Sequence, residues 1–449
     1  MQIEGRVRII KRARIRFSHI PCYLGTFATM VAAKGGAFGE IRSVRAGKNY
    51  KVRDLDILVP SEEVFDEICD ETRAMEGLDL IGVKDVVQET HLGGKIAISA
   101  RVPVETVDDL GLVYTPGVAA MCKKIHANKD LAYDYTTIQN NVAIVTNGTA
   151  ILGLGDIGPV AGMPVMEGKS LLFRALADIN GYPILIDSKD SEVIVQAVKA
   201  IAPTFGAIKL EDIRAPECFD IENRLDEELD IPVVHDDQHG TAIVVLAALL
   251  NIAKYTYINL KRSSVGILGL GAAGSGIFKL LAAYGIGEIY GTDINPEMIR
   301  RFEAAGGRPE DLAGVMKRAD VIIATTGKPG LISSSMVRER QVILALSNPD
   351  PEIHPDDAIA AGAAFAADGR GVNNALAFPG LFRGALNARA TRVNNAMKIA
   401  AAKAVAELAD DGDLVPNILD REVHAQVAAA VEQAALKTGV VRFIDGDQV

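Results

Sequence analysis

Two pairs of neighbouring carboxylates carry the clearest chemical signal in this chain of 449 residues. Glu211-Asp212 follows the run 207–210, and Asp236-Asp237 follows the run 233–234, and both runs read as short strands. In a parallel sheet both pairs lie at the carboxyl edge, where ligands bind. Grouped acids need compensation by a cation or by protons, and oxygen ligands suit Mg²⁺ or Mn²⁺. The spacing therefore predicts a hard divalent-cation site.

A zinc site and a surface acidic turn are the competing interpretations of these residues. His235 and His239 flank the second pair at i,i+4 spacing, and Cys218 lies upstream. Zinc needs convergent nitrogen or sulfur ligands, and we do not expect the residues between the histidines to form a helix-presented zinc motif. The hard-cation interpretation is therefore favoured.

The pattern Gly-x-Gly-x-x-Gly occurs twice, at 153–158 and at 269–274. The second copy follows a strand predicted over 265–268 and opens a helix predicted over 273–284, so its amides can hold a pyrophosphate at a helix N-terminus. The first copy is followed by Pro159 and a stretch to Gly168 that we expect to be irregular, which predicts a turn or an active-site loop. The dinucleotide site is therefore assigned to the second copy.

The predicted dinucleotide ligands are Gly269, Gly271, Ala272, Ala273, Gly274 and Asp293. Asp293 ends a strand predicted over 288–292, where a carboxylate can bind the adenosine ribose. Ile294, Asn295, Pro296 and Glu297 follow it. Because none of these residues is basic, nothing there would bind a 2′-phosphate. NAD is favoured, and NADP stays open.

The elements that must position these residues alternate between apolar strands and helices. Runs at 142–145, 183–187, 207–210 and 233–234 predict a parallel sheet with helices on both faces. A second unit of this type begins at Ser264. The predicted fold class is α/β, with a Rossmann-type NAD-binding domain and a parallel α/β catalytic domain, preceded by an α+β domain. The predicted domains are 1–86, 87–250 (catalytic and metal), 251–390 (NAD-binding) and 391–449 (helical).

Residues 1–86 read β-α-β-β-α-β, the split β-α-β ferredoxin-like plan. Basic residues alternate with apolar ones over 12–17, which predicts a half-buried strand rather than a targeting peptide. A helix is predicted over 26–33, a second opens at Ser61, and strands are predicted over 40–45, 52–59 and 78–87. The segment resembles an ACT domain, a module that often binds an amino acid. Cys22 and Tyr23 fill the turn before the first helix, so a structural, dimer-building role is the alternative.

Net charge, hydropathy and cysteine spacing argue against several classes of protein. The formal net charge is -11, which disfavours nucleic acid and acidic membranes as partners. The apolar run 242–250 is too short to span a bilayer. Four cysteines without CxxC spacing predict neither a disulfide framework nor a zinc ribbon. We expect a cytoplasmic protein.

From His91 onward, several segments resemble those of the malic enzyme family and occur in the same order along the chain. The matching segments are 91–96, 114–119, 150–158, 164–169, 211–216, 235–242, 347–349 and 373–380. The resemblance implies oxidation and decarboxylation of malate to pyruvate with reduction of NAD(P). It departs at Ala150, where some relatives carry a substrate-binding arginine, and in a shorter loop before Asn373.

The resemblance also implies the roles of individual residues. Lys169 is the general base for the C2 hydroxyl, and Tyr114 is the acid that protonates C3. Asp236 orients Lys169 or supports the metal shell. The implied metal ligands are Glu211, Asp212 and Asp237, and the implied substrate ligands are Asn348 and Asn374, with Asn348 also at the nicotinamide.

Two other functions compete with this one. An amino-acid dehydrogenase also pairs a substrate domain with a Rossmann domain, but it needs no metal and leaves the carboxylate pairs unexplained. A catalytically silent metabolite sensor would not need the lysine, tyrosine and acids together. A homodimer or a higher homo-oligomer, with a small-molecule effector at the ACT-like domain, completes the expectation.

Overall fold

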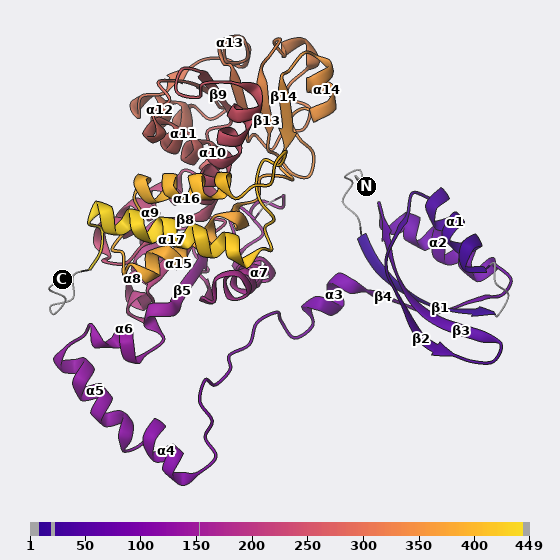
Figure 1. The fold of residues 1–449 in the computed structure, drawn as a ribbon, viewed down its shortest axis with the longest axis horizontal. Coiled ribbons are helices and arrows are strands. Elements are labelled where there is room, and N and C mark those ends of the chain that lie inside the picture. Colours follow the sequence, from indigo (N-terminus) through magenta and orange to yellow (C-terminus); the bar gives the residue numbers. More distant parts are fainter. Residues whose placement is uncertain (1–8, 19–22, 152, 443–449) are drawn as a thin grey trace. The chain divides into compact units, whose positions relative to one another are not determined.

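The computed structural model describes residues 9–18, 23–151 and 153–442. The chain divides into two compact units, Met1–Ala97 and Ile98–Val449 (Figure 1).

The N-terminal unit is a four-stranded antiparallel sheet with strand order β2-β3-β1-β4, and α1 and α2 lie on one face of it (Figure 1). Its elements are β1 Ile9–Ser18, α1 Tyr23–Ala33, β2 Ala37–Ala46, β3 Tyr50–Val59, α2 Glu62–Ala74 and β4 Leu78–Asp85. This is the ferredoxin-like order that the sequence predicts. The alternation in β1 is confirmed, because Ala13, Ile15 and Phe17 are buried.

Two predictions within this unit are wrong by a few residues. Helix α1 begins at Tyr23 and not at Thr26, so the predicted turn through Gly25 is helical from Tyr23 onward; Cys22 lies outside the described residues. Strand β4 ends at Asp85, because the Asp85 side chain accepts a hydrogen bond from the Gln88 amide at 2.8 Å and caps the next helix, α3 Val86–His91.

The first sheet of the larger unit is parallel, with strand order β6-β5-β7-β8. Its strands are β5 Asn141–Thr146, β6 Asn180–Leu185, β7 Ala207–Leu210 and β8 Val233–His235. The helices between and after them are α7 Pro159–Ala177, α8 Ser191–Ile201, α9 Glu217–Glu228 and α10 Asp236–Thr256. The predicted parallel sheet is confirmed, although the strand expected over 183–187 lies at 180–185.

The prediction of an irregular stretch after the first glycine motif is wrong. Helix α7 begins directly after Gly158, which takes φ of 81° and forms the N-cap. Pro159 occupies the first helical position, where the missing N–H removes no intrahelical hydrogen bond. Lys169 therefore projects from a long helix and not from a loop.

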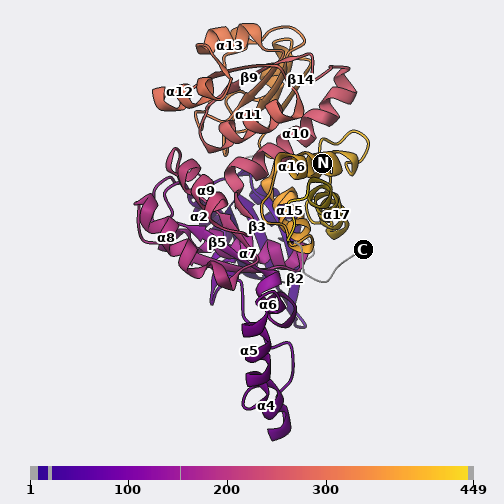
Figure 2. The same ribbon diagram turned by 90° about the vertical axis from the view of Figure 1, so that its left-hand side faces the viewer.

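The second parallel sheet, which includes the strands labelled β9 and β14 in Figure 2, has the order β11-β10-β9-β12-β13-β14, which is the Rossmann order counted from β9. Its strands are β9 Ser264–Leu268, β10 Glu288–Thr292, β11 Arg308–Pro309, β12 Val321–Ala324, β13 Val342–Ala345 and β14 Phe365–Asp368. Its helices are α11 Ala272–Tyr284, α12 Pro296–Ala304, α13 Leu312–Arg318 and α14 Pro355–Ala360. The predicted Rossmann-type domain is confirmed.

Three C-terminal helices, α15 Phe378–Asn387, α16 Asn395–Glu407 and α17 Arg421–Thr438, pack against one another and against the first sheet's helices α7 and α10. Helix α10 contacts α16 and also α11 of the second sheet. It is long and apolar enough to cross a membrane by length and composition, but 67% of its apolar window is buried inside the unit. We therefore interpret α10 as a core helix, which extends well beyond the apolar run 242–250.

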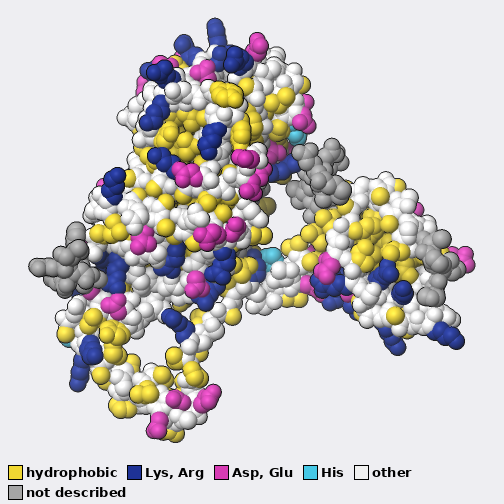
Figure 3. Space-filling view, in the orientation of Figure 1, with side chains coloured by type: hydrophobic (Ala, Val, Ile, Leu, Met, Phe, Trp, Pro, Cys, Tyr) yellow, Lys and Arg dark blue, Asp and Glu magenta, His cyan; other side chains and the backbone are white. Residues whose placement is uncertain are grey.

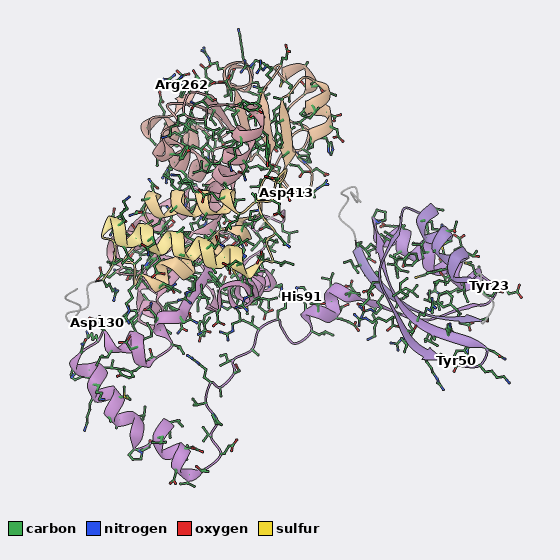
Figure 4. The ribbon with its side chains drawn as sticks, in the orientation of Figure 1. Tyr23, Tyr50, His91, Asp130, Arg262 and Asp413 are labelled. Carbon is green, nitrogen blue, oxygen red and sulfur yellow. The ribbon has the colours of Figure 1, made fainter. Side chains whose placement is uncertain are left out.

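A helical arm of α4 Val107–Val113, α5 Gly117–Ala127 and α6 Leu131–Tyr135 precedes β5. These three helices contain no buried side chain. Apolar side chains of this region lie on the surface (Figures 3 and 4), namely Ile98, Val102, Val104, Val107, Leu110, Leu112, Val113 and Val118. An apolar surface of this kind is typical of a segment that packs against another chain.

Candidate active site

Three carboxylates meet where β7 and β8 end. Glu211 and Asp212 follow β7, and Asp237 lies in the first turn of α10, directly after β8. One oxygen of each lies within 4.8 Å of one oxygen of the others, which is the spacing of a potential metal site. The sequence prediction that these acids converge at the carboxyl edge of the sheet is therefore confirmed in its geometry.

Asp212 has the environment of a cation ligand. Its backbone takes φ of 51°, and its amide donates to Asp237 Oδ2 at 3.0 Å, which fastens the two acids together. The residue is buried, and its Oδ2 atom has no hydrogen-bond partner among the described residues. Burial, and then the charge of Asp237, raise the pKa of Asp212 to about 7. A hard divalent cation would satisfy this oxygen, so the donor set fits Mg²⁺ or Mn²⁺.

Lys169 lies beside the acids, on α7. Its Nζ is 2.9 Å from Asp236 Oδ2, 2.9 Å from Glu211 Oε1 and 3.2 Å from Asn374 Oδ1. Burial alone would raise the pKa of Asp236, but the charges of Lys169 and Lys209 and their hydrogen bonds hold it below its usual value. The structure therefore brings together residues that are far apart in the sequence around one lysine amine.

Sequence reasoning missed Lys209. It lies in β7, it is 0% exposed, and its Nζ is 2.9 Å from Asp236 Oδ2 and ion-paired with Glu211 Oε2. Burial lowers its pKa to about 8, so it stays mostly protonated at neutral pH. A lysine inside the otherwise apolar run 207–210, two positions before the first of two acids, was the signal available.

The histidines do not form a zinc set. His239 Nε2 lies 2.9 Å from Glu222 Oε1, and Lys398 Nζ lies 3.0 Å from His239 Nδ1. His235 is buried and is the N-cap residue of α10, with Nε2 at 3.5 Å from Asp237 Oδ2. The segment between the histidines does begin a helix, contrary to expectation. His239, however, contacts Glu222, which is not one of the three converging carboxylates.

Glu222 is a second group that sequence reasoning missed. Its carboxylate accepts hydrogen bonds from the His235 amide at 2.7 Å and from Gln238 Nε2 at 2.9 Å. These bonds fix the first turn of α10. Asp236 and Asp237 lie in that turn, so Glu222, which lies on α9, fixes the position of both aspartates.

The second glycine motif has the geometry of a dinucleotide loop. Gly269 takes φ of 88°, and a Cβ on Gly274 would lie 1.8 Å from the Gly269 carbonyl oxygen, so only glycine fits there. Ala272 and Ala273 open α11, with Gly271 as the N-cap. Asp293 Oδ2 accepts a hydrogen bond from the Leu270 amide at 2.6 Å, which braces the loop from the end of β10.

Two predicted site residues stand apart from the cluster around Lys169. Tyr114 is 66% exposed at the end of α4, and no hydrogen bond joins its hydroxyl to any residue that the structure describes. Asn348 is exposed in the loop after β13. Asn374, by contrast, contacts Lys169 directly.

The Rossmann sheet, the glycine loop and the lysine among clustered acids define a metal-assisted, dinucleotide-dependent oxidoreductase. The family model "Malic enzyme, N-terminal domain" matches residues 93–194, and "Malic enzyme, NAD binding domain" matches residues 300–436. A model for the NAD binding domain of D-isomer specific 2-hydroxyacid dehydrogenases matches residues 247–329.

Relatives match over most of the chain. NAD-dependent malic enzyme 1 of Bacillus subtilis is 51% identical, over 95% of this chain and 98% of the relative. NAD-dependent malic enzyme of Geobacillus stearothermophilus is 42% identical, over 98% of each. The crystal structure of malic enzyme from Pyrococcus horikoshii superposes with a TM-score of 0.75 at 39% identity, over 80% of this chain and 93% of that one. This chain belongs to the malic enzyme family.

Proposed function

We propose that this protein oxidises and decarboxylates malate to pyruvate and CO₂ while reducing NAD. The observation that carries the proposal is the Lys169 amine, held at 2.9 Å from Asp236 and from Glu211 beside the convergent acids. A base for a hydroxyl proton and a cation site for the same oxygen are the groups that this reaction needs.

Each residue of the site has a separate role in the proposal. Glu211, Asp212 and Asp237 would hold a Mg²⁺ or Mn²⁺ ion, which would supply positive charge at the C2 oxygen of malate. Lys169, in its neutral form, removes the C2 hydroxyl proton as the C2 hydride passes to NAD.

Other side chains prepare and complete this step. Asp236 orients Lys169, and Asn374 fixes the lysine amine from the other side and contributes to binding malate. Tyr114 donates the proton to C3 after CO₂ leaves, and Asn348 contacts substrate and nicotinamide. The dinucleotide binds at Gly269, Gly271, Ala272, Ala273, Gly274 and Asp293.

One assay tests the activity. NADH and NADPH formation from malate are followed with Mn²⁺ and after EDTA treatment, and pyruvate is measured alongside. We expect metal-dependent NADH with one pyruvate per NADH. Reduction without pyruvate would indicate a different hydroxy acid or an amino-acid dehydrogenase, and no reduction would favour a silent sensor.

We infer that the protein works as a homodimer or a higher homo-oligomer. The arm α4–α6 exposes apolar side chains and carries Tyr114, which no described contact joins to Lys169. A second copy would cover the arm. Mixing Tyr114→Phe with Lys169→Ala tests whether a site draws on two copies, because activity would return only then. Light scattering that gives a monomer at micromolar concentration would contradict the proposal.

The N-terminal unit is proposed to be an ACT-like regulatory or subunit-joining domain of about residues 1–86, attached to a cytoplasmic enzyme. The ring of Tyr23, the first residue of α1, lies against Gly77, where a Cβ would lie 2.3 Å from the ring, so the space beside the start of α1 is filled. Both edge strands, β2 and β4, expose apolar side chains, among them Ile41 and Ile81, which a second copy could cover.

Truncation and calorimetry test this assignment. A chain that begins near Asp85 should keep malate oxidation, with altered assembly or an altered response to metabolites. Titration of the full chain with amino acids should show weak binding or none at this domain. A micromolar amino-acid ligand that the truncated chain no longer binds would instead make the domain a sensor.

A further inference from the structure

Lys209 is a fully buried lysine in the strand that leads to the acids. Its side chain is 0% exposed. It lies on the same face of β7 as Glu211, because residues i and i+2 of a strand point to the same side. A buried ammonium loses its hydration shell, so it is stable only with charged or hydrogen-bonding partners.

Lys209 faces the same two carboxylates as Lys169. Each lysine Nζ lies 2.9 Å from Asp236 Oδ2, and each pairs with one of the two oxygens of Glu211. Both amines also lie over the Phe378 ring, at 5.0 Å for Lys169 and 4.8 Å for Lys209. The roles of the two lysines nevertheless differ, because Lys169 is partly exposed and Lys209 is sealed from solvent.

The formal charges of the site depend on Lys209. With every group counted in its charged form, before Lys169 acts as a base, the site has four carboxylates (Glu211, Asp212, Asp236 and Asp237) and two ammonium groups that face them. Two negative charges remain, which is the amount that one divalent cation neutralises. Without Lys209 three would remain, and a buried site with unbalanced charge is costly.

We propose that Lys209 is an internal counter-cation, whose charge beside Glu211 and Asp236 limits the negative charge of the site to what one divalent ion neutralises. The inference rests on the metal site of the proposed function. It assigns to Lys209 no proton transfer and no contact with substrate.

Loss of the Lys209 charge should change the Mn²⁺ affinity in the opposite direction from loss of packing. Removing a positive charge beside the metal site strengthens the attraction for a cation, so Lys209→Met and Lys209→Gln should bind Mn²⁺ more tightly. We expect the Mn²⁺ dissociation constant to fall by about tenfold or more, as for a like charge a few Å from a divalent ion. A residue that only supports packing would leave the affinity unchanged or weaken it when lost.

The experiment titrates Mn²⁺ into the EDTA-treated full chain without malate or NAD and counts free Mn²⁺ by electron paramagnetic resonance. Lys209→Gln keeps the approximate size and a donor group, in case Lys209→Met does not fold. Lys209→Arg keeps the charge and should bind Mn²⁺ within about threefold of the parent. Lys199→Met is the matched control, since Lys199 is partly exposed and pairs with Glu228 elsewhere.

The outcomes separate this inference from the proposed function. Tighter Mn²⁺ binding in the Met or Gln variant, with parent-like binding in the Arg variant, supports the counter-cation role. Unchanged or weaker binding in the charge-removing variants would overturn the inference alone. A parent chain that binds no Mn²⁺ would overturn the metal site and this inference together.

Discussion

Lys169 and Asp236 are 67 residues apart in the sequence, yet Lys169 Nζ donates to Asp236 Oδ2 at 2.9 Å. The lysine projects from α7, and the aspartate lies in the first turn of α10, which Glu222 fixes from outside. A positioned amine of this kind is what general-base catalysis requires.

Lys169→Ala should lower kcat by about 10²–10⁴-fold, the usual contribution of a positioned general base. The fold and NAD binding should persist, because Lys209 still faces both carboxylates. Steady-state kinetics, circular dichroism and NAD titration measure these properties, with Lys199→Ala as the control. Turnover within threefold of the parent would remove Lys169 from the mechanism.

Asp237→Asn should weaken Mn²⁺ binding while leaving NAD affinity within about twofold. The carboxylate is one of three that converge, and a neutral amide is a poorer ligand for a hard cation. Metal titration of the variant beside the parent checks this. An unchanged Mn²⁺ affinity would move the metal site elsewhere, and stoichiometric zinc in the purified parent would revive the histidine interpretation.

Asp212 predicts a pH dependence of the metal-free protein. Its pKa is raised from 3.8 to about 7, so the folded protein keeps a proton that the unfolded chain loses, and the stability that this contributes is full below about pH 4 and is lost progressively as pH rises to about 7. In EDTA, the stability of Asp212→Asn relative to the parent should therefore increase by ~1–3 kcal/mol between pH 5 and pH 8. Denaturant melts of both proteins measure the difference; a constant difference across this range would contradict the burial argument.

The glycine loop gives a matched pair of variants. A Cβ on Gly274 would meet the Gly269 carbonyl oxygen at 1.8 Å, whereas a Cβ on Gly271 meets no atom within 4 Å. Gly274→Ala should lose about 1–3 kcal/mol of stability and weaken NAD binding. Gly271→Ala should keep the stability and weaken NAD binding only, because it crowds the pyrophosphate. Parent-like NAD affinity in both variants would place the dinucleotide at another loop.

The sequence by itself determined the types and the order of the elements. The period-two alternation of β1, the apolar strands followed by acids and the glycine motif before α11 are local signals, since each depends on residues a few positions apart. The same local signals predicted that Glu211, Asp212 and Asp237 meet at one edge, because parallel strands end there together.

Only the tertiary structure decided which distant side chains touch. No local pattern reveals that Lys209 points at Asp236, or that Glu222 fixes the start of α10, since these contacts join separate elements. The helix after Gly158 was missed because two prolines made 159–168 read as a loop, although a proline at the first helical position costs no hydrogen bond. The electrostatics of the site are therefore decided by packing, because burial and distance, and not residue type alone, fix the strength of each charge interaction.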